Sequence, residues 1–205
     1  MIIELTDLGK RFNGTWIFRH LQYRFSSPKH YAVTGPNGSG KSTRLQVIAG
    51  TATCQAGSVR YRDGDRLLDP AQQYRYFSLA APYLELVEEM TLAEFLSFHH
   101  SLKGWIDGRS DREIMAAVGL EASSGKQLRY FSSGMKQRVK LAQAIFSDVP
   151  VVLLDEPATN LDEDGVQLYR RFVQEHCRDR LTIISSNDTV EYDFCEEKID
   201  LRNYK

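Results

Sequence analysis

Residues 35–42 read GPNGSGKS and match the pattern GxxxxGK[ST], in which a backbone folds around a phosphate group. The glycines allow N–H groups to point inward at an anion, and a helix beginning near Lys41 adds the positive end of its dipole. Lys41 supplies a mobile positive charge for the β- and γ-phosphates of a nucleotide, and the Ser42 hydroxyl can ligate Mg²⁺. The expected nucleotide contacts are Gly35, Pro36, Asn37, Gly38, Ser39, Gly40, Lys41, Ser42 and Thr43.

Two acidic residues follow an apolar run, VVLLDEP, about 110 residues after this loop. The run predicts a buried strand, and a strand beside the one that enters the loop would bring Asp155 near Ser42, where it can hold Mg²⁺ directly or through water. Glu156 points differently and can orient or deprotonate an attacking water. Two solvated acids at a strand end are the plainer interpretation, but their order after a complete phosphate loop favours a catalytic pair.

The loop and the acids together favour hydrolysis of a nucleoside triphosphate. Alone, the glycine-rich pattern leaves kinases, GTPases, motors and transporter engines open. A kinase needs an acceptor pocket for a second substrate, and the sequence gives no indication of such a pocket. Hydrolysis needs a phosphate loop, Mg²⁺ and a positioned water, so we expect Lys41 and Glu156 to be catalytic.

The first part of the chain reads as strands. Residues 1–8, 16–25 and 58–64 are rich in β-forming residues and are bounded by turn signals. A short apolar strand over 30–35 leads into the phosphate loop, and helical periodicity follows over 41–48. These patterns predict an antiparallel β lobe at the N-terminus, beside the first strand of a nucleotide-binding sheet.

The middle of the chain is helical, and the end alternates helix and strand. Capping-box patterns at Thr91 and Ser110 each precede an apolar helical pattern. Later elements are expected as a helix over 133–146, a strand over 149–157, a helix over 165–177 and a strand over 181–188. The order predicts an α/β fold in one domain over 1–205, with a parallel sheet and an inserted helical subdomain. The core is expected over 1–79 and 148–205, and the helical subdomain over 80–147.

Composition narrows the classes of partner. The chain is 42% hydrophobic and 26% charged, which is typical of a globular domain, and its net charge of −1 argues against a nucleic-acid partner. No apolar run reaches the roughly 18–20 residues that span a bilayer, and the N-terminus lacks a signal-peptide core, so a membrane function would need another chain. Three widely spaced cysteines argue against a disulfide framework or a zinc site and favour a reducing cytoplasm.

Residues 130–146, YFSSGMKQRVKLAQAIF, resemble the signature motif of the ATP-binding cassette (ABC) family, usually written LSGGQ, and its basic helix. Ser132 and Gly134 match the motif, whereas Ser133 replaces its first glycine and a methionine replaces its glutamine. From the residues themselves, Ser132, Ser133 and Gly134 predict a helix N-terminus that can bind an anion. The phosphate that it binds would belong to the nucleotide of a second copy of the chain, because Lys41 already faces the phosphate of the chain's own nucleotide.

The resemblance covers nearly the whole chain and implies the parallel sheet of the P-loop NTPases. The sequence ATNLD at 158–162 matches the family's loop after the acidic strand, in which Asp162 would act across a dimer. Phe12 falls where the family stacks an aromatic ring on adenine. Trp16 is the other candidate, and either residue is equally an ordinary core aromatic.

Two family positions are changed in this chain. The family's glutamine at the edge of the helical subdomain falls on Ala80 or Ala81, and its histidine after the last strand falls on Asn187. Asparagine can hydrogen-bond a γ-phosphate oxygen but carries no charge, and the resemblance implies Asn187 as a third catalytic position beside Lys41 and Glu156. A positioned acid or base is worth about 10²–10⁴ in rate, so with Glu156 and Lys41 retained we expect a slow ATPase rather than an inactive one.

The resemblance implies the ATP-binding and ATP-hydrolysing subunit of an ABC transporter, with ATP and Mg²⁺ bound. Two cassettes, as a homodimer or a heterodimer, would power a separate transmembrane permease from the cytoplasmic face of the cell membrane. The compact length resembles the small cassettes of exporters, including those of cytochrome maturation. Residues 83–90 are expected either in the docking groove for the permease or as an ordinary exposed edge.

Two other functions are alternatives to that of a transporter engine. One is an ATP-dependent binding switch with slow or incidental hydrolysis, which Asn187 would suit. The other is a family member that acts on nucleic acid. Members resembling translation factors carry two cassettes, and those resembling chromosome-organising proteins carry a long coiled coil, so a single short cassette without basic excess disfavours that function.

Overall fold

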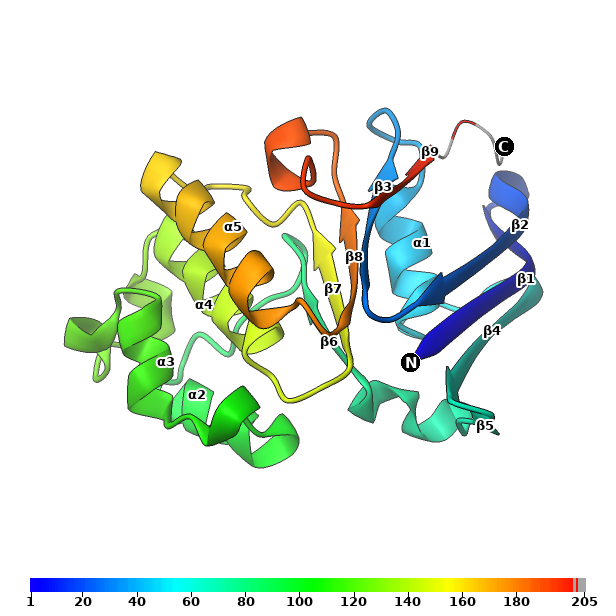
Figure 1. Cartoon of the computed structure of the whole chain (residues 1–205). Coiled ribbons are helices and arrows are strands. Elements are labelled where there is room, and N and C mark those ends of the chain that lie inside the picture. The colour runs from blue at the N-terminus through cyan, green and yellow to red at the C-terminus, as the bar shows by residue number, and fades with distance from the viewer. Residues whose placement is uncertain (201, 203–205) are drawn as a thin grey trace.

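The computed structural model describes residues 1–200 and Arg202, and its centre is a five-stranded parallel sheet (Figure 1). The strand order is β6-β7-β8-β3-β9. The strands are β3 (Lys29–Thr34), β6 (Phe77–Ala80), β7 (Val151–Asp155), β8 (Leu181–Ser185) and β9 (Glu197–Asp200). Because β3 pairs with both β8 and β9, the strand that enters the phosphate loop lies inside the sheet.

A second sheet is antiparallel and has the order β2-β1-β4-β5. Its strands are β1 (Ile2–Phe12), β2 (Thr15–Ser26), β4 (Ala56–Asp63) and β5 (Arg66–Leu67). A turn at Asn13 and Gly14, both with positive φ, joins β1 and β2 into a long hairpin. The antiparallel N-terminal lobe expected from the sequence is therefore confirmed.

The α-helices are α1 (Lys41–Ile48), α2 (Leu92–Lys103), α3 (Asp111–Ala117), α4 (Ser133–Ile145) and α5 (Glu163–His176). Thr91 and Ser110 form the predicted capping boxes with Glu94 and Glu113, so two helix starts are fixed by local sequence. None of the helices in the described part of the chain combines the length and the apolar character that crossing a bilayer requires.

The parallel sheet separates two hydrophobic cores. Val152 and Leu154 of β7 pack into one core with residues of α2 to α5, whereas Val151 and Leu153 pack into the other with α1 and the antiparallel sheet. Figure 1 shows the same division, with α2 to α5 on one side of the sheet and α1 and the antiparallel strands on the other. The four apolar side chains of β7 are fully buried, as expected for a parallel strand covered on both faces.

Several boundaries differ from the sequence prediction. The short strands β5, β6 and β9 were not predicted, because two to four residues are too few for a clear periodic pattern. Helix α5 begins at Glu163 rather than 165, because Asp162 caps it by accepting a hydrogen bond from Gly165 N. The expected core segment 148–205 includes positions 201 and 203–205, which lie outside the described residues.

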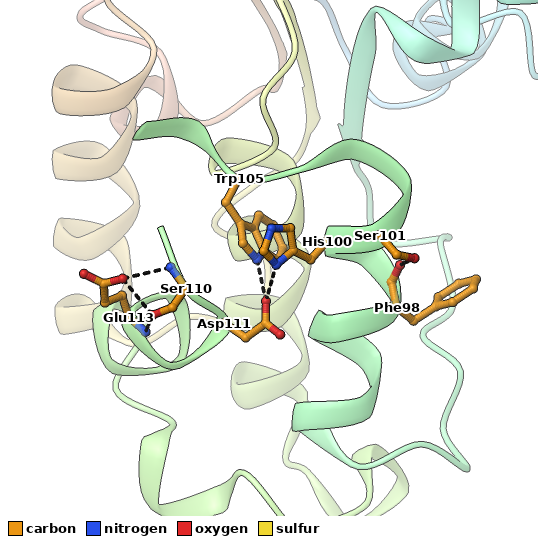
Figure 2. Close-up of polar contacts among 7 residues, drawn as sticks. All are labelled: Phe98, His100, Ser101, Trp105, Ser110, Asp111 and Glu113. Carbon is orange, nitrogen blue, oxygen red and sulfur yellow. Dashed lines mark hydrogen bonds and ion pairs between the residues drawn. The ribbon is translucent and has the colours of Figure 1, made fainter. Parts of the chain in front are cut away.

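A polar cluster joins the end of α2 to the start of α3 (Figure 2). Asp111 Oδ1 accepts a hydrogen bond of 2.7 Å from Trp105 Nε1 and lies 2.8 Å from His100 Nδ1. The Trp105 ring is buried and stacks on His99 with a centroid separation of 5.1 Å. One carboxylate oxygen thus fixes the connection between two helices of the helical subdomain.

We expect Asp111→Ala to lower the free energy of unfolding by about 1–3 kcal/mol, because the buried indole N–H of Trp105 loses its acceptor. Urea denaturation followed by tryptophan fluorescence measures this change. The matched control is Asp179→Ala, which removes an exposed carboxylate in a turn and should change stability by less than about 0.5 kcal/mol. An Asp111→Ala variant as stable as the control would contradict the assigned role.

Candidate functional site

Lys41 begins α1 directly after the phosphate loop (residues 35–43). Its side chain is 5% exposed, and Nζ donates hydrogen bonds to Gly35 O at 2.9 Å and to Pro36 O at 3.4 Å. Burial lowers the pKa of Lys41, whereas the nearby Glu156 and Asp155 carboxylates raise it. The loop therefore holds a partly desolvated cation beside two acids.

An open cleft of about 360 Å³ lies along the loop. Gly40 has a φ of 86°, and a Cβ there would lie 2.3 Å from Ile17 Cγ2, so only glycine fits. Phe12 is 51% exposed and lines the cleft, whereas the Trp16 ring covers Gly9 and is not among the lining residues. The cleft is lined by Phe12, Ile17, Asn37, Gly38, Gly40, Lys41, Ser42, Thr43 and Glu156; the expected contacts Gly35, Pro36 and Ser39 do not line it.

Asp155 ends β7 and pairs in register with Ser185 of β8. Its side chain is 1% exposed, and neither carboxylate oxygen has a well-formed hydrogen bond within the described part of the chain. Burial raises the pKa of Asp155, while the nearby Ser42 and Ser185 hydroxyls lower it. A buried carboxylate that lacks a well-formed hydrogen bond among the described residues, beside a serine hydroxyl, fits the oxygen ligands that Mg²⁺ prefers.

Glu156 lies at the meeting point of two clefts. Its φ is 43°, an uncommon value for a residue with a side chain, and its N–H donates to Ser185 O at 2.8 Å. It lines the loop cleft and a second cleft of about 380 Å³ that also contains Asn187. The Asn187 amide donates a hydrogen bond to Asn37 Oδ1 of the phosphate loop. Glu156, Asn187 and the phosphate loop are therefore gathered at one edge of the sheet.

Glu191 supports this arrangement and was missed by the sequence analysis. It is 4% exposed, and its Oε1 accepts a hydrogen bond of 2.7 Å from Ala158 N. Burial raises the pKa of Glu191. The contact joins the segment that carries Asn187 to the loop that follows Glu156, so it holds both near the second cleft. The only indication of this role in the sequence is that Glu191 follows Asn187 by four residues.

The serine–glycine turn (residues 132–134) begins α4, which Ser132 caps through its side chain. A Cβ on Gly134 would lie 3.0 Å from Asn160 O, so the turn passes close to the loop after β7. Asp162 of that loop lies 3.2 Å from Arg138 Nη2 of α4. A cleft of about 540 Å³ brings together the predicted residues Ser132, Ser133, Gly134 and Asp162.

The phosphate loop and the serine–glycine turn line different clefts of one chain. Within the described residues, the two clefts share no lining residue. The turn presents the N-terminus of a thirteen-residue helix to its own cleft, where backbone N–H groups can meet an anion. One chain thus carries two separate surfaces suited to phosphate.

Arg44 is a buried cation behind the phosphate loop that the sequence analysis did not identify. It is 2% exposed, its Nη1 donates to Ser39 O at 2.8 Å, and its guanidinium lies 4.2 Å from the centroid of the Phe18 ring. Burial lowers its pKa to about 10. By binding a loop carbonyl on the inner side, Arg44 supports the backbone whose N–H groups are expected to face phosphate.

The two positions on which the family's glutamine falls are buried alanines. Ala80 and Ala81 are both fully buried. Tyr83, two residues later, is 41% exposed and lies near the Gln46 side chain of α1. Burial and the nearby Asp155 carboxylate raise the pKa of Tyr83 to about 12. A phenol therefore approaches the acids from the segment that follows β6.

Comparison with known sequences places most of the chain in one family. Residues 18–159 match the sequence model of a family described as ABC transporter. The chain is 29% identical over 191 residues to the cytochrome c biogenesis ATP-binding export protein CcmA of Brucella abortus, covering 91% of this chain and 85% of that protein. It is also 29% identical over 187 residues, with the same coverage, to the uncharacterized ABC transporter ATP-binding protein YybJ of Bacillus subtilis.

Two solved structures share the fold. A putative ABC transporter ATP-binding protein from Pyrococcus furiosus superimposes with a TM-score of 0.82 at 22% identity, covering 100% of both chains. An ATP binding subunit of an ABC transporter gives a TM-score of 0.85 at 23% identity, covering 98% of this chain and 85% of the other. At these identities the likeness concerns the fold alone, and it confirms the α/β architecture expected from the sequence.

We expect Arg44→Leu to weaken ATP binding about tenfold or more, because the loop loses a charge-assisted hydrogen bond that supports its backbone. Arg44→Lys keeps the charge without the planar fork and should give an intermediate affinity. Equilibrium titration with ATP and Mg²⁺ measures both, and circular dichroism checks that each variant is folded. Arg178→Leu, at an exposed turn, is the control. Wild-type affinity in folded Arg44→Leu would show that the loop does not depend on Arg44.

Proposed function

The chain belongs to the ABC transporter family as an ATP-binding subunit, and from this premise we propose that it hydrolyses ATP to power a separate membrane subunit. One observation carries the proposal: Lys41, Ser42 and Glu156 line a single cleft, with the buried Asp155 close to Lys41. A cation for the phosphates, oxygen ligands for a metal and a carboxylate for the water are the parts that such hydrolysis requires.

The phosphate loop would bind the β- and γ-phosphates through its backbone N–H groups. The Lys41 ammonium, which donates to loop carbonyls, would turn to the phosphate oxygens, which are stronger acceptors. Phe12, which is half exposed and lines the cleft, would stack on the adenine ring, a contact worth about 1 kcal/mol. Because Phe12 lines the cleft and Trp16 does not, Phe12 is the better candidate for this role.

Ser42 and Asp155 are proposed as the residues that would hold Mg²⁺. When bound, this ion neutralises charge on the β- and γ-phosphate oxygens. The Asp155 carboxylate oxygens, which lack a well-formed hydrogen bond among the described residues, support the assignment, because a buried carboxylate is costly unless a cation or hydrogen bonds compensate it.

Glu156 is proposed to orient the attacking water and to accept its proton as the water oxygen bonds to the γ-phosphorus and ADP leaves. Asn187 would donate its amide N–H to a γ-phosphate oxygen in exchange for its bond to Asn37. An amide adds no positive charge where negative charge develops, so turnover should be slow but measurable.

Two chains are proposed to enclose two ATP molecules. Ser132, Ser133 and Gly134 would contact the γ-phosphate held by the partner's loop, and Asp162 would lie at the same interface. The separate clefts of one chain support this reading, since the turn needs a phosphate from elsewhere. ATP that touches both chains favours the closed pair, and hydrolysis removes that bias. The proposal covers both a homodimer and a heterodimer with another cassette.

The helical subdomain, proposed over 80–147, would pass the closing motion to a transmembrane permease, while 1–79 and 148–205 form the core. Val87, Phe98 and Leu102 of this subdomain are 45%, 48% and 65% exposed, and such apolar side chains suit a protein interface. Docking there would hold the chain at the cytoplasmic face of the membrane. The segment 83–90, which contains Val87, is a loop.

A second candidate is an ATP-dependent binding switch in which hydrolysis is incidental. The contact between Asn187 and Asn37 favours it, because an uncharged amide bridge across the second cleft suits holding a nucleotide more than cleaving it. ATP turnover measured with and without the permease separates the two functions. A transporter engine is stimulated by its membrane partner, whereas the switch is not.

We expect Glu156→Gln to bind ATP, to lose hydrolysis and to accumulate as a dimer, because ATP then stays between the two chains. Size-exclusion chromatography with light scattering in excess ATP and Mg²⁺ measures the mass. Glu175→Gln, at an exposed helix position, is the control and should turn over without accumulating dimer. If Glu156→Gln remains monomeric while ATP is bound, the two-chain site is wrong.

We expect Asn187→His to raise kcat by about tenfold or more, because an imidazolium adds positive charge and a second donor at the γ-phosphate. Steady-state phosphate release over pH 6–8 measures the rate. Asn187→Gln keeps the amide and serves as the control without a gain. A rate in Asn187→His equal to or below the unsubstituted rate would mean that the missing imidazole does not limit turnover.

A further inference from the structure

The end of β1 is tied to the segment that follows α1. Lys10 Nζ donates a hydrogen bond of 2.6 Å to Thr53 O. Gln55 N of the same segment donates to Gly9 O at 2.8 Å. Phe12, two residues after Lys10, is the last residue of the strand. Because α1 begins in the phosphate loop, the strand end that carries Phe12 is fixed to the chain directly after the loop's own helix.

Lys10 is a buried cation beside the Phe12 ring. The residue is 5% exposed, and its ammonium lies 4.7 Å from the centroid of the ring. In the described part of the chain, no carboxylate forms an ion pair with Lys10, and its polar contacts are the Thr53 carbonyl and this ring. A buried cation without a paired carboxylate is costly, so the negative potential of the ring face helps to stabilise it.

The same ring reaches the loop cleft. Phe12 is 51% exposed and lines the cleft, whereas Lys10 is not among the lining residues. The ring thus contacts a buried ammonium and at the same time presents exposed area to the cleft. The face of a phenyl ring carries negative potential, which opposes a second π-face stacked on it. An ammonium beside the ring compensates this potential and favours such stacking.

We propose that Lys10 is a positioning residue for the nucleotide base and acts through the Phe12 ring. The inference rests on the proposed function, because it concerns the base-binding part of that same site. The ammonium holds the ring in one orientation before ATP binds, which lowers the conformational entropy that is lost on binding. It also makes the ring a better stacking partner for a base. Both effects act on the base and leave the contacts of the triphosphate with residues 35–43 unchanged.

Isothermal titration of the full chain with ATP and with tripolyphosphate, each with Mg²⁺, tests this role, because tripolyphosphate lacks the base. Lys10→Met keeps the apolar stem and removes the charge. It should weaken ATP binding about threefold, the size expected from one cation–π contact, and leave tripolyphosphate binding unchanged. Lys10→Arg keeps a cation beside the ring and should restore most of the ATP affinity. In a Phe12→Ala background, adding Lys10→Met should not weaken ATP binding further, because the ring through which Lys10 acts is gone.

Two further variants complete the experiment. Lys10→Gln is neutral but can still donate a hydrogen bond to Thr53 O, so it should show the same base-dependent loss, and it replaces Lys10→Met if that variant does not fold. The matched control is Lys198→Met, which removes an ammonium 5.3 Å from the centroid of the Tyr192 ring, a pair that does not line the loop cleft. Its affinity for ATP should equal that of the unsubstituted chain. Circular dichroism checks that each variant is folded.

The possible failures can be told apart. Unchanged ATP affinity in the folded neutral variants of Lys10 overturns the inference. An equal loss of affinity for tripolyphosphate overturns it as well, and so does a loss that persists in the Phe12→Ala background, because the effect would then not act through the ring. If the unsubstituted chain binds neither ATP nor tripolyphosphate, the proposed ATP site itself is overturned, and this inference with it.

Discussion

The structure depends on one arrangement of charge, a buried lysine and two acids at the carboxyl edge of a parallel sheet. Lys41 satisfies its ammonium with two carbonyls of its own loop, and Asp155 is 1% exposed with carboxylate oxygens that have no well-formed hydrogen bond among the described residues. Burial disfavours both charges. A polyphosphate with its cation compensates them together, so the loop and the acids are best understood as two halves of one site.

The parallel sheet is what brings these halves together. Strands β3, β7 and β8 are neighbours, and Ser185 of β8 pairs with Val33 of β3 on one side and with Asp155 of β7 on the other. Three chain segments therefore leave the sheet at the same level: the phosphate loop, Glu156 and the segment that carries Asn187. The two hydrophobic cores pack against opposite faces of the sheet. The relative positions of these segments are therefore fixed by packing far from the site.

Local patterns allowed the sequence to predict the fold class, the capped helices and the order of the chemical groups. Side chains that act through tertiary contacts could not be predicted in this way. Arg44 looks like an ordinary residue in a short helix, and only the fold places its guanidinium under the Ser39 carbonyl. The family pattern assigns the polar position at the edge of the helical subdomain to Ala80 or Ala81, because such a pattern fixes positions along the chain and not in space. Tyr83 lies near Gln46 of α1 because the chain turns after β6, and no sequence pattern predicts this turn.

Isothermal titration of ATP with Mg²⁺ into the unsubstituted chain and into Lys41→Ala tests most directly whether the loop is a triphosphate site. The account predicts saturable binding of one ATP per chain, weakened about tenfold to a hundredfold by Lys41→Ala, because a charge-assisted hydrogen bond to phosphate is lost. Equal affinity of the two folded proteins for ATP would contradict it.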